Sequence, residues 1–282
     1  MNNFFVCPKC GVPIHNHEMN TCFQVKNQIP ILIENYSQLE SELAQLQDLK
    51  KAWYSDNQLG YLTGPYRHHV KLRLNYLKDL VSRYFKNSKD LRLLDIGCGD
   101  GFNLHWLREF FSNITASDYN FLRASRAQAS GIASEVALAD ITQYPASNDS
   151  WDVVFFHHVL EHIPNDEKAL SEVFRILKSG GHCILGVPNE GALWWRLAYQ
   201  LEPHTKETTD HVHFYTLKSI SRLCKSVGFE IVETKRLGYG VPHWTLDTLL
   251  RQYKFIHDAL ELIGSLFYPS QASSLYLLLR KP

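Results

Sequence analysis

The sequence predicts an α/β fold in which a mostly parallel sheet is covered by helices on both faces. From residue 91 onward, short apolar segments of strand length alternate with segments whose apolar residues recur every three to four positions. A glycine-rich turn, LLDIGCGDG at 93–101, joins the first of these strands to the first helix. Such alternation is typical of βαβ units, and their parallel strands need a helical layer on each side.

Composition narrows the class of protein. The 282 residues are 45% apolar and 21% charged, which predicts a folded chain of one large domain with an appendage. Lys+Arg and Asp+Glu both number 29, so the zero net charge disfavours a nucleic-acid partner. No apolar run reaches the roughly 20 residues of a transmembrane helix, and MNNFFVCPKC does not resemble a secretory signal. We therefore expect a cytoplasmic protein.

The first 33 residues form a cysteine-bearing appendage. In the segment CPKCG, Cys7 and Cys10 have the spacing that lets two thiolates reach one tetrahedral ion. Cys22 is the candidate third ligand, and His15 or His17 the fourth, with His17 preferred. The second C-x-x-C pair of a complete zinc ribbon is absent. A zinc site and a metal-free remnant both remain open.

Residues 34–88 are expected to form a helical linker and a lid. Ser37 and Glu40 have capping-box spacing, which predicts a helix start. An apolar stripe follows at Leu39, Leu43, Leu46 and Trp53. We expect this helix to pack on the main domain, with a dimerising coil as the alternative. Gly64 and Pro65 interrupt the pattern, and a second amphipathic helix should run to about Phe85.

Residues 89–282 form the main domain. Strands are expected at 91–97, 114–118, 134–140, 151–156, 182–188, 229–234 and 273–279. Helices are expected at 102–111 and 121–129, from the cap Asn165 to Gly180-Gly181, and from Thr216 to Gly228. Between 246 and 267 a further apolar rhythm predicts a helix packed before the last strand. The alternative for this last helix is a surface that covers an apolar acceptor or touches a membrane.

The glycine loop indicates the class of ligand. Its pattern, Gly97-x-Gly99-x-Gly101, differs from the G-x-G-x-x-G of dinucleotide enzymes. Asp95 and Asp100 also bring negative charge to the place where a pyrophosphate would bind. The site therefore suits a ligand that lacks phosphate and carries ammonium or sulfonium charge, such as S-adenosylmethionine.

Two further aspartates end the next two strands. Asp118 closes the second strand, where a carboxylate could accept both hydroxyls of a ribose. Asp140 closes the third strand, where it could accept from an adenine amino group. The structural alternative is that these aspartates only cap the helices that follow.

Together, LLDIGCGDG, ASDYN, ALADI, WDVVFFHHVLEHIP and RILKSGGHCILGVPN resemble the class I S-adenosylmethionine-dependent methyltransferases over about residues 60–240. Within that class, HHVLEHIP and the later DHVHFYTLKSISRLCKSVGFEIVE resemble the branch of the ubiquinone-biosynthesis O-methyltransferases. The first 33 residues are similar to zinc-ribbon-like modules attached to or partnering some methyltransferases.

The resemblance implies a Rossmann-like, seven-stranded methyltransferase sheet whose final strand is antiparallel. By position, it implies a methionine site, a ribose site, an adenine site and a residue near the methyl group. The residues implied in that order are Asp95, Gly97, Gly99 and Gly101; Asp118; Asp140 and Ile141; and His157. Cys98 and Tyr119 are expected as further cofactor-binding residues.

The segment HHVLEH supplies the candidate catalytic residues. His158, Glu161 and His162 are spaced to share one face of the helix expected after the fourth strand. We expect them mainly to support the loop. The alternatives are a general base in His158 or His162 and, after it, a site for a divalent cation. The resembling enzymes place a carboxylate where His158 stands, which weakens the metal interpretation. Candidate acceptor contacts elsewhere are His68, His69, His211 and His213.

We therefore predict an enzyme that transfers the methyl group of S-adenosylmethionine to an oxygen or nitrogen of a small molecule. Correct alignment of the reacting atoms should dominate the rate. Two alternatives remain open. One is an RNA methyltransferase with a zinc-ribbon recognition segment, which the zero net charge disfavours. The other is a non-catalytic partner subunit. The identity of the acceptor and the oligomeric state stay open.

Overall fold

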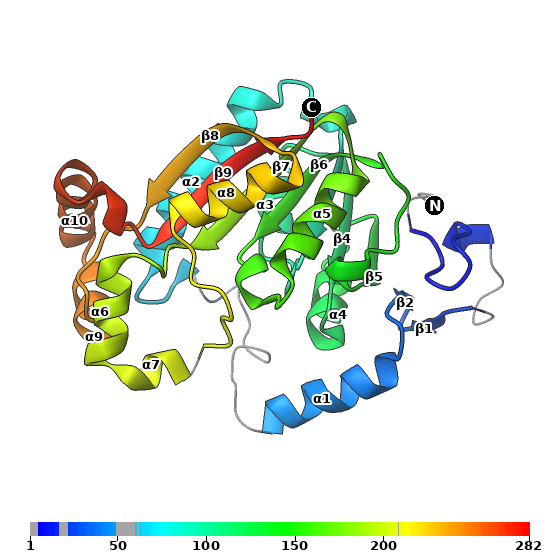
Figure 1. Cartoon of the computed structure of the whole chain (residues 1–282), viewed down its shortest axis with the longest axis horizontal. Coiled ribbons are helices and arrows are strands. Elements are labelled where there is room, and N and C mark those ends of the chain that lie inside the picture. The colour runs from blue at the N-terminus through cyan, green and yellow to red at the C-terminus, as the bar shows by residue number, and fades with distance from the viewer. Residues whose placement is uncertain (1–4, 17–21, 49–59, 61, 208) are drawn as a thin grey trace.

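The predicted strands lie side by side in one sheet. The computed structural model describes residues 5–16, 22–48, 60, 62–207 and 209–282. In this part of the chain the strand order is β1-β2-β5-β4-β3-β6-β7-β9-β8 (Figure 1). The strands are β1 (Gln24–Lys26), β2 (Ile29–Ile31), β3 (Arg92–Ile96), β4 (Asn113–Asp118), β5 (Glu135–Leu138), β6 (Trp151–His157), β7 (Leu177–Pro188), β8 (Glu230–Leu237) and β9 (Ser274–Arg280).

Seven of these strands confirm the expected methyltransferase-type sheet. The strands β5, β4, β3, β6 and β7 run parallel. The last strand, β9, is antiparallel to both of its neighbours, β7 and β8. The chain builds outward from β3 in one direction through β4 and β5, and then in the other through β6 and β7. This reversal leaves a crevice at the carboxyl ends of β3 and β6, where doubly wound sheets bind ligands.

Helices cover both faces of the sheet (Figure 1). Their bounds are α1 (Tyr36–Asp48), α2 (Arg67–Tyr84), α3 (Leu104–Leu107), α4 (Phe121–Ala129), α5 (Asp166–Ile176), α6 (Leu193–Leu201), α7 (Pro203–Glu207), α8 (Leu217–Val227), α9 (Trp244–Arg251) and α10 (Lys254–Phe267). Short 3₁₀ turns occur at η1 (Ile14–Asn16), η4 (Ser88–Asp90), η5 (Ile141–Gln143), η6 (Leu160–His162) and η7 (Pro269–Gln271). Among the described residues, no helix is both long and apolar enough to cross a membrane.

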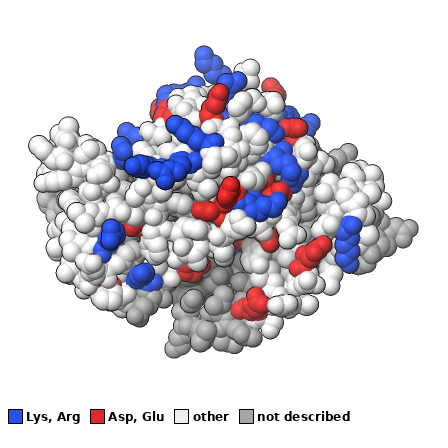
Figure 2. Space-filling view, viewed as in Figure 1, with Lys and Arg blue, Asp and Glu red and all other residues white. Residues whose placement is uncertain are grey.

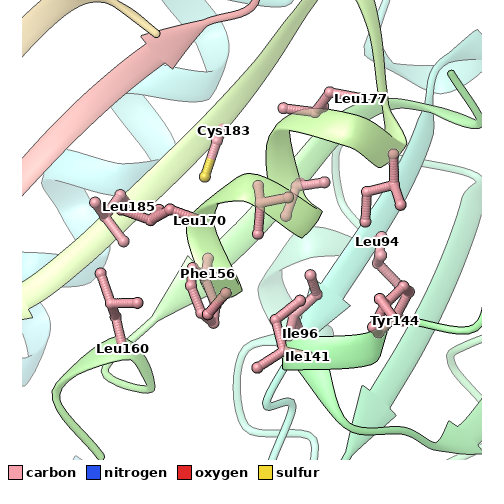
Figure 3. Close-up of a cluster of buried hydrophobic side chains, with 14 of the residues drawn as sticks. Leu94, Ile96, Ile141, Tyr144, Phe156, Leu160, Leu170, Leu177, Cys183 and Leu185 are labelled. Carbon is pink, nitrogen blue, oxygen red and sulfur yellow. The ribbon is translucent and has the colours of Figure 1, made fainter. Parts of the chain in front are cut away.

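Each face of the sheet has its own apolar core. On one face, Leu94 and Phe156 of the strands pack with Leu170 of α5 (Figure 3), and α8 joins the same cluster. On the other face, α2, α3 and α4 pack over the opposite side of the same strands, for example through Leu80 and Leu104. Because residues of the two cores alternate along central strands such as β6 and β9, the sheet is packed on both faces and its carboxyl edge is a stable platform.

The capping signals were informative for two helices. The Asn165 side chain accepts from the Lys168 amide at the start of α5, and Thr216 forms a capping box at the start of α8. The predicted end of α5 at Gly180-Gly181 was wrong. The helix stops at Ile176 because Leu177 already pairs with Trp151 and begins β7.

The capping box predicted for α1 was also wrong. The helix begins at Tyr36, so Ser37 lies inside it, and Glu40 instead accepts from the Lys26 side chain at 2.7 Å. Leu39 is buried against the main domain, as the packing hypothesis requires. Of the other stripe residues, the side chains of Leu43 and Leu46 and all of Trp53 lie outside the described residues.

The amino-terminal segment extends the sheet, which the sequence did not predict. β1 and β2 form an antiparallel pair, and β2 then adds to β5 in parallel through Ile31 and Leu138. Phe5 is fully buried, with its ring 6.1 Å from that of Tyr144 and 6.2 Å from that of Trp151. The expectation of a seven-stranded sheet is therefore corrected by two strands, because apolar residues of this segment complete the core of the main domain.

Candidate functional site

A cavity of about 820 Å³ opens at the carboxyl edge of the sheet. Its walls come from the loops after β3, β4, β5 and β6, from α2, and from the segment 209–211. The volume lies within the range of pockets that bind small molecules and cofactors, about 300–1,000 Å³. It coincides with the crevice that the strand order creates.

The glycine loop after β3 forms the floor of this cavity. Gly97 has φ +70°, and a Cβ atom at this position would lie 2.2 Å from Cγ2 of Val159, so only glycine fits. The amides of Gly97 and Cys98 donate to the Ser117 carbonyl at 2.8 and 3.0 Å, which ties the loop to the end of β4. Gly97 and Cys98 both line the cavity, and their contact with a cofactor stays a prediction.

The other predicted loop residues play supporting parts. The Gly99 amide donates to Oδ2 of Asp118 at 2.8 Å, and a Cβ at Gly101 would lie 3.2 Å from Cα of Ala127 on α4. Gly101 therefore allows α4 to approach the loop closely. Neither glycine lines the cavity, nor does Asp95. Direct contact of these three residues with a cofactor stays a prediction.

Asp118 links the glycine loop to the cavity wall. Its Oδ1 accepts from the Asn120 amide and its Oδ2 from the Gly99 amide, both at 2.8 Å. Each carboxylate oxygen has a second lone pair, so both can still accept from a ribose hydroxyl. Burial raises the pKa of Asp118, although the two amides and the nearby Arg123 oppose the change. Asp118 lines the cavity, and its predicted role at a ribose stays a prediction.

The predicted adenine and ribose neighbours also line the cavity. Asp140 caps η5, with its Oδ1 accepting from both the amide and the hydroxyl of Thr142 at 2.8 Å. It therefore has the capping role that the structural alternative expected, and it also lines the cavity. Ile141 is 7% exposed and Tyr119 is 44% exposed, so the two offer an apolar wall and an accessible aromatic ring.

Asp95 lies beneath the glycine loop, within β3. It is 1% exposed, and its Oδ2 has no hydrogen-bond partner among the described residues. Burial, together with the charge of Asp118, raises the pKa of Asp95 to about 8. In the free protein this carboxyl group is therefore mostly protonated near neutral pH.

We expect the free energy of unfolding to fall as pH rises from about 4 to about 8, because there the unfolded chain ionises Asp95 while the folded chain keeps it protonated. Asp95→Asn should remove this contribution. Urea denaturation without cofactor at about pH 5 and about pH 9 should then show a smaller loss of stability in the variant. Asp79→Asn, at an exposed position, is the control. An unchanged pH dependence in Asp95→Asn would contradict the prediction.

His157 ends β6 and lines the cavity. Its position near the methyl group, which the resemblance implied, stays a prediction. Its Nε2 lies 3.3 Å from an Arg73 guanidinium nitrogen and 3.2 Å from the Tyr276 hydroxyl. Burial and the charges of His158 and Arg73 hold the pKa of His157 well below its usual value, so the ring is neutral. The sequence did not single out Arg73, because only the packed structure brings α2 over the cavity.

The three residues of HHVLEH do not lie on a helix as predicted. His158 has φ +54° in the turn after β6, Glu161 and His162 lie in the 3₁₀ turn η6, and α5 starts only at Asp166. They nevertheless cluster: Oε1 of Glu161 is 3.3 Å from Nδ1 of His158 and 3.9 Å from Nε2 of His162. All three line the cavity.

His162 and the neighbouring His211 are each held by a carboxylate. Nδ1 of His162 lies 2.8 Å from Asp210, and Nδ1 of His211 lies 2.8 Å from Glu190. The two imidazole rings are 4.7 Å apart. The sequence suggested His211 as an acceptor contact but missed both carboxylates. The available sequence signal for Asp210 was its position directly before His211.

The pKa directions separate the candidate bases. Burial, followed by the Arg73, His211 and His162 charges, holds the pKa of His158 well below its usual value, which makes it a weak base. Burial opposes a lower pKa at Asp210, but the hydrogen bond to His162 and the charges of His162 and His211 together lower this pKa and keep the carboxyl group ionised. An ionised Asp210 at Nδ1 leaves Nε2 of His162 as the proton acceptor. His162 is therefore better placed than His158.

The other histidines with a suggested acceptor role lie outside the cavity lining. The His68 ring stacks on His257 at 6.0 Å, and His69 is buried against Gly238. Nε2 of His213 lies 3.0 Å from the Ile163 carbonyl, so this ring braces the loop after η6. Contact of these three histidines with an acceptor stays a prediction, although α2 places His68 against α10 and His69 against the residue after β8.

Two groups within the described residues have metal-ligand geometry. One is Cys7, Cys10 and Cys22, whose sulfur atoms lie within 4.8 Å of one another. The predicted fourth ligand, His17, lies outside the described residues. The other group is Glu161, His162 and His211, whose candidate ligand atoms meet the same limit. The second group keeps the cation interpretation of the histidine cluster open.

Comparison with known sequences found a matching family model and similar proteins. A family model described as a methyltransferase domain matches residues 66–234. A ubiquinone biosynthesis O-methyltransferase of Rickettsia bellii is 26% identical over 219 residues, covering 73% of this chain and 89% of that relative.

Solved structures share the fold. A phosphoethanolamine N-methyltransferase of Haemonchus contortus in complex with S-adenosyl-L-methionine superposes with a TM-score of 0.54 at 18% identity, covering 74% of this chain and 52% of that one. A SAM-dependent methyltransferase of Archaeoglobus fulgidus has a TM-score of 0.51 at 18% identity, with coverages of 73% and 94%.

Proposed function

The chain belongs to the methyltransferase domain family as a class I S-adenosylmethionine-dependent enzyme, and on this basis we propose that it methylates an oxygen or nitrogen of a small molecule. The observation that carries the proposal is the His162–Asp210 pair beside the glycine loop, in one cavity of about 820 Å³. A hydroxyl acceptor must lose its proton on methylation, and this pair offers a base at that place. The name of the Rickettsia relative supports an O-methyl acceptor.

We propose that different residues of the cavity bind different parts of the cofactor. S-adenosylmethionine supplies the methyl group. Gly97 and Cys98 hold its methionine part, Asp118 and Tyr119 its ribose, and Asp140 and Ile141 its adenine, while His157 stands near the methyl group. The loop residues Asp95, Gly99 and Gly101 support this arrangement from below.

The protein's contribution to the rate is mainly orientation. Transfer requires the acceptor atom, the methyl carbon and the sulfur to lie in line, and a closed cavity keeps water away from them. In this proposal His162 accepts the proton of the acceptor through Nε2, and Asp210 holds the ring in the required orientation. His158 and Glu161 then shape the turn that carries His162.

Two measurements test the proposed function. Titration calorimetry should detect binding of S-adenosylmethionine by the purified chain. Incubation with radiolabelled cofactor and a panel of phenols, alcohols and amines should then label a small molecule, while a parallel reaction with total RNA stays unlabelled. Labelling of the RNA alone would contradict the proposal and favour the RNA methyltransferase alternative.

We further propose that residues 1–33 bind one zinc ion through Cys7, Cys10 and Cys22, with His17 as the fourth ligand. Support comes from the convergence of the three sulfur atoms and from the tight turn between Cys7 and Cys10, where the Gly11 amide donates to the Cys7 carbonyl. Thiolates at one point repel one another unless a cation or protons neutralise them. A bound ion would also fix the segment that carries β1 and β2.

Purified full-length protein should contain about one equivalent of zinc. The double variant Cys7→Ser/Cys10→Ser should contain none, and its melting temperature should drop because the amino-terminal strands lose their anchor. Elemental analysis by mass spectrometry and a thermal melt check both results. Lys9→Ser, in the same turn, is the matched control. Wild-type protein that holds no zinc after preparation without chelator would favour the metal-free remnant.

A further inference from the structure

One end of the molecule carries many large apolar side chains in contact with solvent. The exposed residues, which we call the apolar end face, are Leu193, Leu197, Leu201, Leu246, Leu249, Tyr253, Phe255, Leu262, Ile263, Leu266, Phe267 and Tyr268. They come from α6, α9, α10 and the residues beside them. Figure 2 shows that this end, at the left, bears few charges on the visible side.

The three helices form a single unit. Trp195 of α6 packs on Trp244 of α9 with ring centres 4.4 Å apart, and Trp194 of α6 packs at 5.1 Å on Tyr268, which itself belongs to the apolar end face. The stripe predicted over 246–267 is split between two helices and is not covered by the sheet. Leu249 and Phe267, for example, are 55% and 70% exposed. A rigid base thus presents an apolar surface that nothing in the described chain covers.

The size of this surface matches a protein interface. Twelve large side chains, most about half exposed, present on the order of 1,000 Å² of apolar area. The largest apolar patch of a typical monomer is about 300–600 Å². A stable interface buries about 800 Å² on each partner. The apolar end face is therefore large enough for a stable dimer and larger than a monomer normally leaves exposed.

The pattern along α10 fits a second copy of the same helix. The exposed residues Phe255, Ala259, Leu262 and Leu266 are spaced by four, three and four positions, which is the repeat of a helix–helix seam. This spacing is symmetric about its centre. When two copies of α10 pair antiparallel about a two-fold axis, Phe255 meets Leu266 and the small Ala259 meets the large Leu262. The surface is thus complementary to itself, as a two-fold interface requires.

The charges of this region disfavour a lipid bilayer. Helices that lie on membranes usually carry Lys and Arg along their polar face. The helices α6, α9 and α10 contain three basic and three acidic residues: Arg196, Arg251 and Lys254, and Asp247, Asp258 and Glu261. Arg251 is buried on Asp247, and Lys254 pairs with Asp258 at 2.6 Å. This neutral surface suits an uncharged protein partner.

We propose that the apolar end face is the interface of a homodimer in which two α10 helices pair antiparallel about a two-fold axis. The exposed apolar residues of α6 and α9 flank this central pair. The cavity is lined by none of the twelve residues, so each copy keeps a complete site. This assembly is independent of the acceptor and of the methyl transfer itself.

Sedimentation equilibrium of the full chain at about 1–100 µM tests the assembly. We expect a mass of twice 32.6 kDa for the wild type. Leu262→Glu should weaken self-association at least 100-fold, because each dimer would bury two carboxylates at its centre. Since Leu262 is 62% exposed, the variant should fold and keep its circular dichroism spectrum. Val232→Glu, at an exposed apolar position on β8, should remain dimeric.

A crosslink tests the orientation. Ala259→Cys combined with Leu262→Cys should give a covalent dimer under mild oxidation. Phe255→Cys alone should form no more covalent dimer than the wild type, because the two copies of residue 255 lie at opposite ends of the seam. A wild type that stays monomeric at about 100 µM, or a Leu262→Glu variant that stays dimeric, would overturn the proposal. Sedimentation of the monomer with phosphatidylcholine–phosphatidylglycerol vesicles would assign the surface to a bilayer instead.

Discussion

Asp118→Ala should weaken binding of S-adenosylmethionine by two orders of magnitude or more. The variant loses two acceptor atoms for the ribose hydroxyls, and a hydrogen bond to a charged group is worth about 1.5–3 kcal/mol. It also loses the bond from the Gly99 amide, which holds the glycine loop against the end of β4, and the bond from the Asn120 amide in the turn after β4. Both losses act in the same direction, because a misplaced loop also binds the methionine part less well. Titration calorimetry measures the change directly.

Two companion variants separate these contributions. Asp118→Asn keeps one acceptor oxygen, so its loss of affinity should be smaller than that of the alanine variant. Asp100→Asn serves as the matched control, since this buried loop aspartate pairs with Arg126 at 3.3 Å and does not line the cavity. It should bind the cofactor nearly as well as the wild type. Binding by Asp118→Ala within threefold of the wild type would show that the ribose site lies elsewhere.

The fold was largely predictable because local pattern and tertiary structure agree in the main domain. Strands such as β6, WDVVFFH, are buried on both faces and therefore read as continuous apolar runs. The caps Asn165 and Thr216 act locally, so their side chains set the start of a helix regardless of the rest of the chain. The end of α5 was missed because pairing of Leu177 with Trp151 is a long-range contact that no local signal reveals.

The candidate site also has one part that the sequence predicts and one part that only the packed structure shows. The glycine loop and Asp118 are positioned by the ends of single strands, so their place follows from the sequence pattern. The pairs His162–Asp210 and His211–Glu190 join segments that are 48 and 21 residues apart, and Arg73 reaches His157 across 84 residues. Such contacts depend on how α2 and the segment 209–211 fold over the sheet. The sequence alone shows which residue types are present, but it does not show which of them pair in the folded chain.

His162→Ala should lower turnover by about 10²–10⁴-fold if Nε2 of His162 is the general base, because proton transfer typically contributes that much. The affinity for S-adenosylmethionine should stay unchanged, since neither His162 nor Asp210 holds the cofactor in the proposed arrangement. The acidic limb of the pH–rate profile, which protonation of the base produces, should also disappear. Asp210→Asn should lower turnover too, because His162 then loses the carboxylate that orients its ring. His105→Ala, on the exposed side of α3, should leave all these values unchanged.

The same variants decide among the three roles that this cluster can have. A residue that only supports the turn would lower the melting temperature of His162→Ala and reduce turnover, but the pH–rate profile would keep its wild-type shape. A divalent cation held by Glu161, His162 and His211 would make the wild type sensitive to chelator, and added magnesium, manganese or zinc would restore activity. Full activity in chelator, combined with an unaltered profile in His162→Ala, would leave only the supporting role and contradict the base. We expect the base, because Asp210 lies 2.8 Å from Nδ1 of His162 and His162 lines the cavity in which the acceptor must lie.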